Sequence, residues 1–303
     1  MHRHIIYIIN PISGTRAKKD LESFIAEETR KRGIDFDIFP SVASGDYSFL
    51  RPIISEKKTT DVVIGGGDGT INQVVSDLRK LDLNFGIIPC GSGNGLAFSA
   101  GIKKKPIDAL KVIFEGKATP IDAFHVNGKF ACMLCGIGFD AQVAYDFSLQ
   151  KTRGLTTYVK QVVKNFFSAK PYEFEIKLPG KKIETSAYFI SIANSNQFGN
   201  HFTIAPKASL DDGMLDVVIL TDQNKLSLIL QTLKQVAGKV KLQTGSVESE
   251  GRHVVYFQTK EVTILNKSLA PLHIDGDPTE SAPRIEIGVE AGSFRLLKPG
   301  LRV

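Results

Sequence analysis

A glycine-rich loop gives the strongest chemical signal in the sequence. It follows a predicted buried strand, Asp61–Ile64, precedes a predicted helix, Ile71–Leu81, and consists of Gly65, Gly66, Gly67, Asp68, Gly69 and Thr70. Glycines let a backbone approach phosphate groups closely and adopt positive φ, and a helix N-terminus offers unpaired N–H groups to anions. Asp68 could orient a magnesium ion or its waters, and Thr70 could cap the helix or contact a phosphate. We therefore predict a phosphate-binding loop, against the alternative of a glycine-rich turn without a ligand.

Two further loops follow predicted strands in the same part of the chain. One follows Phe85–Ile88 and contains Gly91, Ser92, Gly93 and Asn94. The other closes the strand Ile5–Asn10 and contains Asn10, Pro11, Ile12, Ser13 and Gly14. The Gly65–Thr70 loop has neither the spacing of a P-loop nor the strict GxGxxG of dinucleotide folds. Open α/β sheets bind ligands at the carboxyl ends of their strands, so three such loops predict a phosphate-rich ligand.

The first 121 residues alternate between strand and helix patterns. Besides the strands already named, we expect a strand at Phe36–Phe39 and helices at Lys18–Arg32, Asp46–Lys57 and Ile107–Glu115. This alternation predicts an α/β domain in which helices cover both faces of a parallel sheet.

Short strand patterns dominate from residue 122 to residue 303. We expect strands at Asp122–Val126, Phe130–Cys135, Tyr172–Leu178, Glu184–Ala193, Leu215–Leu220, His253–Gln258, Glu261–Leu265, Arg284–Val289 and Phe294–Lys298. Helical patterns occur only at Thr157–Phe167 and Lys225–Val240. The pattern predicts a second, mainly antiparallel and sandwich-like domain, with a boundary near residues 119–125 and last residues that could return to the first domain.

Composition limits the class of protein. The 303 residues, 42% hydrophobic and 23% charged, suit two ordinary globular domains. The net charge of +6 and pI near 9.0 favour anionic partners such as phosphates or an acidic membrane. Three cysteines exclude a disulfide scaffold and a four-cysteine zinc site, and we expect Cys132 and Cys135 to be buried packing residues.

Six motifs together resemble the diacylglycerol kinase catalytic-domain family, which includes bacterial soluble lipid kinases and the sphingosine and ceramide kinases. They are NPISG at 10–14, GGGDGT at 65–70, GSGNGLA at 91–97, GIGFDA at 136–141, IAPKASLDDGMLDV at 204–217 and IDGDP at 274–278. Their order and spacing extend the resemblance over nearly the whole chain. It implies a first domain similar to phosphofructokinases and NAD kinases, followed by a β-sandwich domain that carries the lipid-substrate and metal residues.

The resemblance also assigns a nucleotide site. ATP would lie on the first domain, and the lipid headgroup would reach the cleft from the second. Asn10 and Gly14 would border the nucleotide, and Ser41 stands where the family often has a threonine near ATP. Gly65–Ile71 would cradle the phosphates, with Ser92 close by.

The metal and the catalytic base are likewise implied by the resemblance. The carboxylate of Asp212 and the backbone carbonyls of Ser209 and Met214 would bind Mg²⁺, a hard ion that prefers oxygen ligands; the alternative is an ordinary Asp-Gly turn. Asp277 occupies the glutamate position of the family's Asp-Gly-Glu and would accept the proton of the lipid hydroxyl, with Asp275 as its rival or helper.

Two residues depart from the family pattern. Asp277 is one methylene shorter than the glutamate it replaces, which reduces the reach of its carboxylate. Gly95 stands where bacterial diacylglycerol kinases usually have an aspartate, so this loop is more similar to the sphingosine-kinase version. That similarity draws the expected substrate towards a sphingoid or other long-chain lipid alcohol.

The resulting hypothesis is an ATP-dependent, magnesium-requiring lipid kinase acting on diacylglycerol or a sphingoid lipid, in which Asp68 organises the metal and phosphates. The alternatives are a soluble-metabolite kinase of the NAD-kinase type and a non-catalytic lipid- or nucleotide-binding member of the family. The first strand pattern has no signal-peptide region before it, and no apolar run approaches the ~20 residues that span a bilayer. We expect a cytoplasmic protein that meets the membrane at its surface.

Partners follow from the same interpretation. The lipid substrate would be met at a membrane, and nucleic acid is not an expected partner. The basic, amphipathic segment Thr157–Pro171 could rest on lipid, although packing on its own domain is favoured. Lys103–Lys105 and Lys181–Lys182 are most simply solvated loops that could also lean on anionic phospholipid. A sheet edge in the second domain could pair two subunits as a homodimer.

Overall fold

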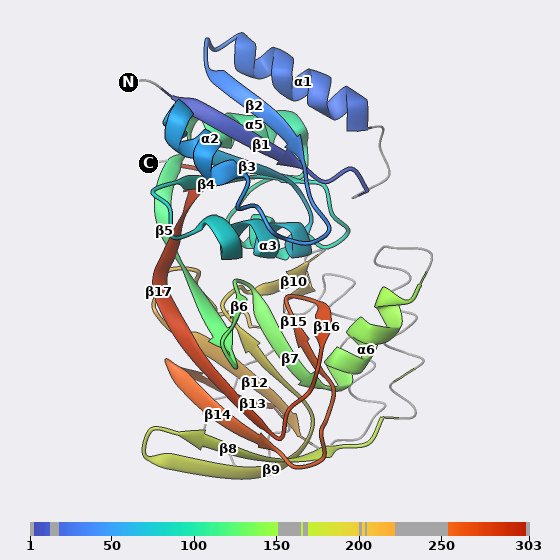
Figure 1. Ribbon diagram of the computed structural model, residues 1–303. Coiled ribbons are helices and arrows are strands. Elements are labelled where there is room, and N and C mark those ends of the chain that lie inside the picture. Colours follow the sequence, from blue (N-terminus) through green and yellow to red (C-terminus); the bar gives the residue numbers. More distant parts are fainter. Residues whose placement is uncertain are drawn as a thin grey trace. The chain divides into compact units, whose positions relative to one another are not determined.

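The computed structural model describes residues 3–12, 18–150, 165, 169–199, 202–203, 205–221 and 254–300. Two compact units divide the chain, and Figure 1 shows their elements. Unit 1 comprises Met1–Ile121 and Gly292–Val303, and unit 2 comprises Asp122–Ala291. Two strands, β5 (Lys117–Val126) and β17 (Arg284–Lys298), therefore contribute residues to both units.

Unit 1 is built on a parallel sheet. Its strands are β1 (His4–Ile9), β2 (Asp35–Pro40), β3 (Asp61–Gly66), β4 (Asn84–Pro89) and the end of β17. They lie in the order β17-β4-β3-β1-β2, and each neighbouring pair is parallel. Every residue of β1 and β3 is buried. Burial on both faces explains why these strands are continuous apolar runs rather than alternating ones.

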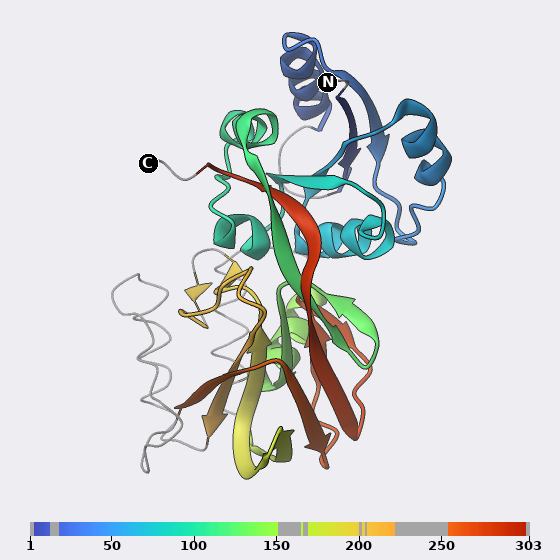
Figure 2. The same cartoon turned by 90° about the vertical axis from the view of Figure 1, so that its left-hand side faces the viewer.

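Helices cover both faces of this sheet. They are α1 (Lys18–Arg30), α2 (Leu50–Lys57), α3 (Asp68–Leu78), α4 (Gly95–Ser99) and α5 (Pro106–Glu115). Figure 2 shows α1 and α5 on one face, with α2 and α3 on the other. The expected α/β domain is confirmed.

Two helices of unit 1 differ from expectation at their starts. α2 begins at Leu50 and not at Asp46, because Asp46 forms a turn in which its Oδ1 accepts the N–H of Ser48 (2.9 Å). α3 begins at Asp68, three residues earlier than expected. Asp68 therefore lies in the first helical turn, where the helix dipole stabilises a carboxylate.

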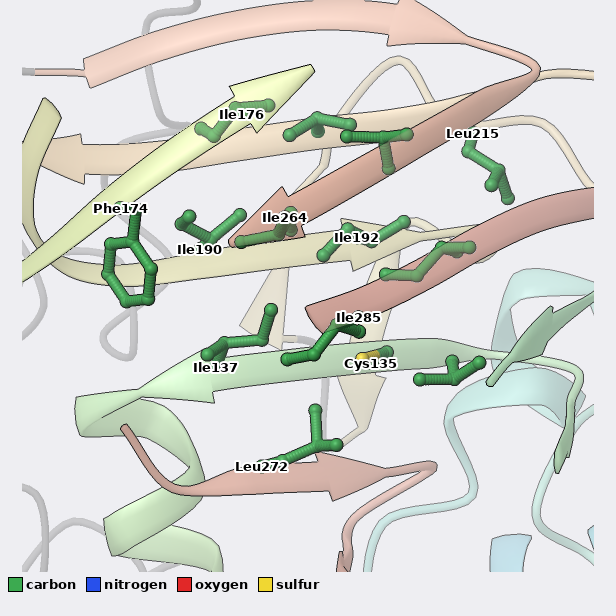
Figure 3. Packing of buried hydrophobic residues seen from close by; sticks show 14 of the residues in the cluster. Cys135, Ile137, Phe174, Ile176, Ile190, Ile192, Leu215, Ile264, Leu272 and Ile285 are labelled. Carbon is green, nitrogen blue, oxygen red and sulfur yellow. The ribbon is translucent and has the colours of Figure 1, made fainter. Parts of the chain in front are cut away.

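Unit 2 is an antiparallel β-sandwich, as expected. Its strands, besides parts of β5 and β17, are β6 (Lys129–Ala131), β7 (Leu134–Gly138), β8 (Tyr172–Leu178), β9 (Lys181–Ala193), β10 (Gln197–Gly199), β11 (Phe202–Thr203), β12 (Leu215–Thr221), β13 (Val254–Thr259), β14 (Glu261–Asn266), β15 (Leu272–Ile274) and β16 (Asp277–Thr279). β9 is the organising strand, because it pairs antiparallel with β7, β8 and β12. Aliphatic side chains of facing strands fill the interior, and Figure 3 shows Ile137, Ile190 and Ile285 among them.

Several elements of unit 2 differ from the expected ones. The single strand expected at Phe130–Cys135 is two strands, β6 and β7. Between them the backbone N–H groups of Cys132 and Met133 bind the carboxylate of Asp275 and not a neighbouring strand. The two last strands are one continuous strand, β17.

Other elements of unit 2 were not expected at all. These are the antiparallel pair β10–β11, the hairpin β15–β16 and the helix α6 (Phe139–Ser148). The expected helix Lys225–Val240 lies outside the described residues, as does Thr157–Phe167 apart from Asn165. No helix among the described residues is long and apolar enough to span a membrane.

Candidate active site

The three predicted loops of unit 1 follow neighbouring strands of one parallel sheet. The strand order β4-β3-β1-β2 reverses its direction between β1 and β3. Such a reversal is the topological switch point at which open α/β sheets bind ligands. Asn10 follows β1 and Gly67 follows β3, so both lie at the switch point.

Asn10 connects the loop that follows β1 (the first loop) to the glycine-rich loop Gly65–Thr70 that follows β3 (the second loop). Its backbone N–H donates to the carbonyl of Gly65 (2.8 Å), and its Nδ2 donates to Oγ1 of Thr70 (2.8 Å). Its Oδ1 accepts the N–H of Ile12 (3.0 Å) and so forms a turn that directs the chain after Pro11. The Asn10 side chain therefore fixes its own loop against the first turn of α3.

Close approach, rather than unusual backbone angles, explains Gly66 and Gly91 in the loops that follow β3 and β4. A Cβ on Gly91 would lie 2.5 Å from Cα of Gly67, and a Cβ on Gly66 would lie 2.8 Å from Cβ of Thr70. Positive φ was expected here, but within these two described loops the residue that adopts it is Asn94 (φ 58°). The fully buried Asn94 accepts the N–H of Gly91 with Oδ1 and donates to its carbonyl with Nδ2 (both 2.8 Å).

Asp68 joins the second loop to the third loop, Gly91–Asn94, which follows β4. Its Oδ2 accepts the N–H of Gly95 (3.1 Å), and its Oδ1 accepts the N–H of Leu96 (3.4 Å). These two donors are at the N-terminus of the short helix α4, whose N-cap residue Asn94 makes no side-chain capping bond. Asp68 thus caps α4.

Replacing Gly91 with alanine is expected to separate the two glycine loops. The new Cβ would overlap Cα of Gly67, which is backbone and cannot rotate away. We expect a loss of about 1–3 kcal/mol in the free energy of unfolding and a weaker affinity for ATP. Urea denaturation and ATP titration measure these effects. Gly288→Ala is the matched control, because its Cβ would meet nothing within 4 Å, and equal ATP affinity in both variants would contradict the assignment.

The other nucleotide candidates of unit 1 are placed as follows. Ser41 comes directly after β2, and its N–H donates to the carbonyl of Ile9 (2.9 Å), so it lies at the same edge of the sheet. Ile71 is buried in α3 and therefore supports the loop from below the surface. Ser92 and Gly93 lie in the turn before α4. Ser13 and Gly14 lie outside the described residues.

In unit 2, Asp275 is a buried carboxylate held by backbone donors. Its Oδ1 accepts the N–H groups of Met133 and Leu134, and its Oδ2 accepts the N–H of Cys132, each at 2.9 Å. The Cys132 thiol also donates to Oδ2 (3.4 Å). Asp275 is 5% exposed and has φ 49°. This geometry stabilises the turn between β15 and β16 and leaves little access for a substrate hydroxyl.

Asp277 differs from Asp275 in its surroundings. It is exposed and begins β16, where it pairs with Ile274 across the hairpin. Because a general base must reach the proton that it accepts, exposure favours Asp277 over Asp275 for this role.

The loop Ser209–Met214 forms a turn around Gly213 (φ 70°). Oδ1 of the exposed Asp212 accepts the N–H of Met214 (3.0 Å), and Oγ of Ser209 donates to Asp211 (2.7 Å). The N–H of Gly213 donates to Oδ2 of Asp122 (2.6 Å). This second carboxylate, which the sequence analysis did not single out, anchors the turn from β5.

The donor chemistry of this turn fits magnesium. The described residues contain no group of three or more His, Cys, Asp or Glu side chains arranged for a metal. Mg²⁺, however, usually retains several waters and needs only one or two carboxylates. Asp212 offers such a carboxylate, and it is exposed.

Asp216 lies four residues further along and is fully buried. Burial raises the pKa of Asp216 to about 6; the hydrogen bond from Gln258 opposes this effect and the negative charge of Asp212 adds to it. The region is therefore rich in negative charge, as a cation site requires.

Cys132 and Cys135 are buried free thiols, as expected. Burial, with smaller effects from Asp140 and Asp275, raises the pKa of Cys135 well above its usual value. This thiol therefore stays protonated and packs in the core, where Figure 3 shows it on β7.

Comparisons with known proteins agree with these observations. Residues 4–126 match the diacylglycerol kinase catalytic domain, and residues 134–298 match the YegS C-terminal NAD kinase beta sandwich-like domain. A Bacillus subtilis (strain 168) protein named diacylglycerol kinase is 27% identical over 275 residues, which cover 89% of this chain and 88% of that protein. A Klebsiella pneumoniae (strain 342) protein named "Probable lipid kinase YegS-like" is 30% identical over 210 residues, 67% of this chain and 70% of that protein.

Solved structures share the fold. A crystal structure of a diacylglycerol kinase from Bacillus anthracis str. Sterne superposes with a TM-score of 0.75 at 19% identity, covering 100% of this chain and 98% of that chain. The second domain match alone spans more than half of the 303 residues, and the first adds the glycine loops. The chain therefore belongs to the diacylglycerol kinase catalytic-domain family.

Proposed function

We propose that this protein is a lipid kinase that transfers the γ-phosphate of ATP to the hydroxyl group of a lipid, diacylglycerol or a sphingoid alcohol. The observation that carries the proposal is the linkage of the glycine loops at the switch point of a parallel sheet, through Asn10, Thr70 and Asp68. The names of the relatives, diacylglycerol kinase and lipid kinase, support the same class of reaction.

The residues of unit 1 would hold the nucleotide. The N-cap of α3 is Gly67, which has no side chain to compete for the first-turn N–H groups, so phosphate oxygens can accept them. Asn10, Ser41 and Ser92 would line the same edge of the sheet. In unit 2, Asp212 and the carbonyls of Ser209 and Met214 would hold Mg²⁺, which would supply positive charge for the reaction.

The residues of unit 2 would act on the lipid alcohol. Asp277 would accept the hydroxyl proton as the oxygen forms its bond to the γ-phosphorus and the bond to the β-phosphate oxygen breaks, which releases ADP. Asp275 would hold the hairpin that carries Asp277. Phosphoryl transfer depends mainly on positioning and charge neutralisation, and that suits a site built from loops and short hairpins.

The substrate would be met at a membrane surface. Lys103–Lys105 are exposed before α5 and could contact anionic phospholipid. We expect faster turnover on vesicles that contain anionic phospholipid than on neutral ones, and we expect added salt to reduce the difference.

Transfer of radiolabelled γ-phosphate from ATP with Mg²⁺ tests the proposal. Micellar diacylglycerol, sphingosine, ceramide and monoacylglycerol are assayed in parallel, with NAD as a soluble acceptor and the Asp277→Asn variant as the blank. Label in one lipid that is absent from the blank supports the proposal and identifies the substrate. Label in NAD alone would indicate a metabolite kinase, and ATP binding without any transfer would indicate a non-catalytic binding protein.

A further inference from the structure

A buried histidine lies in the first strand of the hairpin that carries Asp277. His273 is in β15 and is 1% exposed, and its Nε2 lies 3.6 Å from Oδ2 of Asp140. Asp140 is in the first turn of α6, is 7% exposed, and accepts the N–H of Ala141 with Oδ1 (2.8 Å). Burial raises the pKa of Asp140, and the neighbouring imidazole of His273 opposes that rise.

Gly136 provides the space for this pair. A Cβ on Gly136 would overlap both Oδ2 of Asp140 and Nε2 of His273. Gly136 is in β7 and is the Cα partner of His273 in the antiparallel pairing of β7 and β15. The absence of a side chain at this one position therefore lets an imidazole and a carboxylate share a site inside the domain.

The other ring nitrogen of His273 forms a hydrogen bond with the turn between β15 and β16. Nδ1 of His273 accepts the N–H of Gly276 (3.3 Å). Asp275 (φ 49°) and Gly276 (φ 88°) are the two central residues of the turn between Ile274 and Asp277, and both are left-handed. Two consecutive left-handed residues form the tight turn favoured in two-residue hairpins. The bond to Gly276 thus reaches the residue directly before Asp277.

This bond specifies the tautomer of the ring. A nitrogen that accepts a hydrogen bond carries no proton, so the neutral imidazole has its proton on Nε2, the nitrogen that faces Asp140. The chain of contacts then runs from the Asp140 carboxylate through Nε2–H and Nδ1 to the N–H of Gly276. A proton on Nδ1 would place two donors against each other and break the chain.

We propose that His273 is a positioning residue that fixes the backbone of the Asp275–Asp277 turn, and through it the Asp277 carboxylate, because its Nδ1 accepts the N–H of Gly276. Asp140 faces the other ring nitrogen at 3.6 Å, which is a charge contact and not a hydrogen bond. The catalytic consequence of this positioning rests on the proposed function of Asp277. The shorter aspartate makes backbone placement more important, because a carboxylate with less reach tolerates less displacement of its Cα.

Two isosteric variants separate the two sides of the ring. His273→Asn retains an acceptor near the position of Nδ1 but does not reach Asp140. His273→Gln retains a donor near Nε2 but loses the acceptor for Gly276. Because misplacement of a catalytic group by ~1 Å can cost ~100-fold in rate, we expect His273→Gln to lower kcat by at least ~10-fold with the KM for ATP unchanged. His273→Asn should remain within ~3-fold of the unsubstituted protein.

Two measurements do not depend on catalysis. Long-range ¹H–¹⁵N NMR of the imidazole in the unsubstituted protein should show the proton on Nε2 for His273. Hydrogen exchange of the Gly276 amide should accelerate at least ~10-fold in His273→Gln and stay near its original rate in His273→Asn. His125→Gln is the control, since His125 is partly exposed on β5 and pairs with Glu290.

The outcomes distinguish this inference from the proposed function. A proton on Nδ1, or equal Gly276 exchange in both variants, would overturn the positioning role even if the protein phosphorylates lipid. Equal losses of kcat in both variants would also overturn it, because a merely structural histidine predicts no difference between them. If no lipid is phosphorylated, the proposed function fails, and the NMR and exchange measurements still decide whether His273 holds the turn.

Discussion

Alanine in place of Asp68 is expected to abolish phosphoryl transfer. We expect kcat to fall at least ~1,000-fold, as is typical when a group that organises charge around a transferring phosphoryl is removed. The structure adds a second effect, because Asp68 accepts the N–H groups of Gly95 and Leu96. Losing this cap on α4 should cost about 1–2 kcal/mol in the free energy of unfolding. Micellar kinase assays and urea denaturation measure the two losses separately.

Further variants separate the two roles of Asp68. Asp68→Asn retains oxygen and volume, so it should recover most of the stability and little of the activity. Asp20→Ala removes an exposed carboxylate from the first turn of α1, so it should leave turnover unchanged and cost at most about 0.3–1 kcal/mol in the free energy of unfolding. Turnover at the original rate in Asp68→Ala would show that the second loop does not serve catalysis.

Removing the charge of Asp277 is the second large effect that we expect. Asp277→Asn should lower kcat by ~100- to 10,000-fold, the usual contribution of general base catalysis, while ATP affinity stays unchanged because the nucleotide residues are in unit 1. Asp277→Glu restores the longer side chain of the family pattern and should retain activity. Isothermal titration with ATP and lipid phosphorylation are measured on the same preparations.

Asp275→Asn is the matched comparison, because it makes the same change two residues away. Its new NH₂ group would face a backbone N–H among the three that Asp275 now accepts. That conflict should cost about 1–3 kcal/mol in the free energy of unfolding, whereas Asp277→Asn on the surface should cost little. If Asp275→Asn kept its stability and lost all turnover while Asp277→Asn remained active, the roles of the two aspartates would be reversed.

Sequence patterns predicted the elements that are held by local periodicity. Buried runs such as Ile5–Ile9 and Asp61–Ile64 were recognisable because a parallel strand covered on both faces is apolar throughout. The break between β6 and β7 could not be recognised from the sequence, because it depends on Asp275, which lies 143 residues from Cys132. The expected break within β17 was wrong, because an interruption of the apolar pattern does not have to interrupt the backbone hydrogen bonds. Gly292 and Ser293 interrupt its apolar pattern, but the backbone continues as a strand.

In the candidate site, too, local features were predicted from the sequence and contacts between distant residues were not. Glycine loops and acidic pairs were found from the sequence because their chemistry is local to a few residues. The links between these features were not found from the sequence, because the hydrogen bonds of Asn10 to Thr70 and of Asp68 to Gly95 join separate loops. His273 had no assigned role, because its contact with Asp140 joins residues that lie far apart in the chain. Its position directly before the IDGD motif was the signal that could have indicated one.

The late position of β17 in the sequence has a consequence for how the protein is made. β17 pairs with β4 through Arg295 and Asn84, which lie 211 residues apart in the chain. During synthesis the edge of β4 therefore emerges from the ribosome long before the strand that covers it, and an uncovered edge strand can pair with other chains. A nascent chain that stalls after residue 121 would contain all three glycine loops and still lack the strand that pairs with β4. Synthesis of β17 thus decides when the edge of β4 is protected from pairing with other chains.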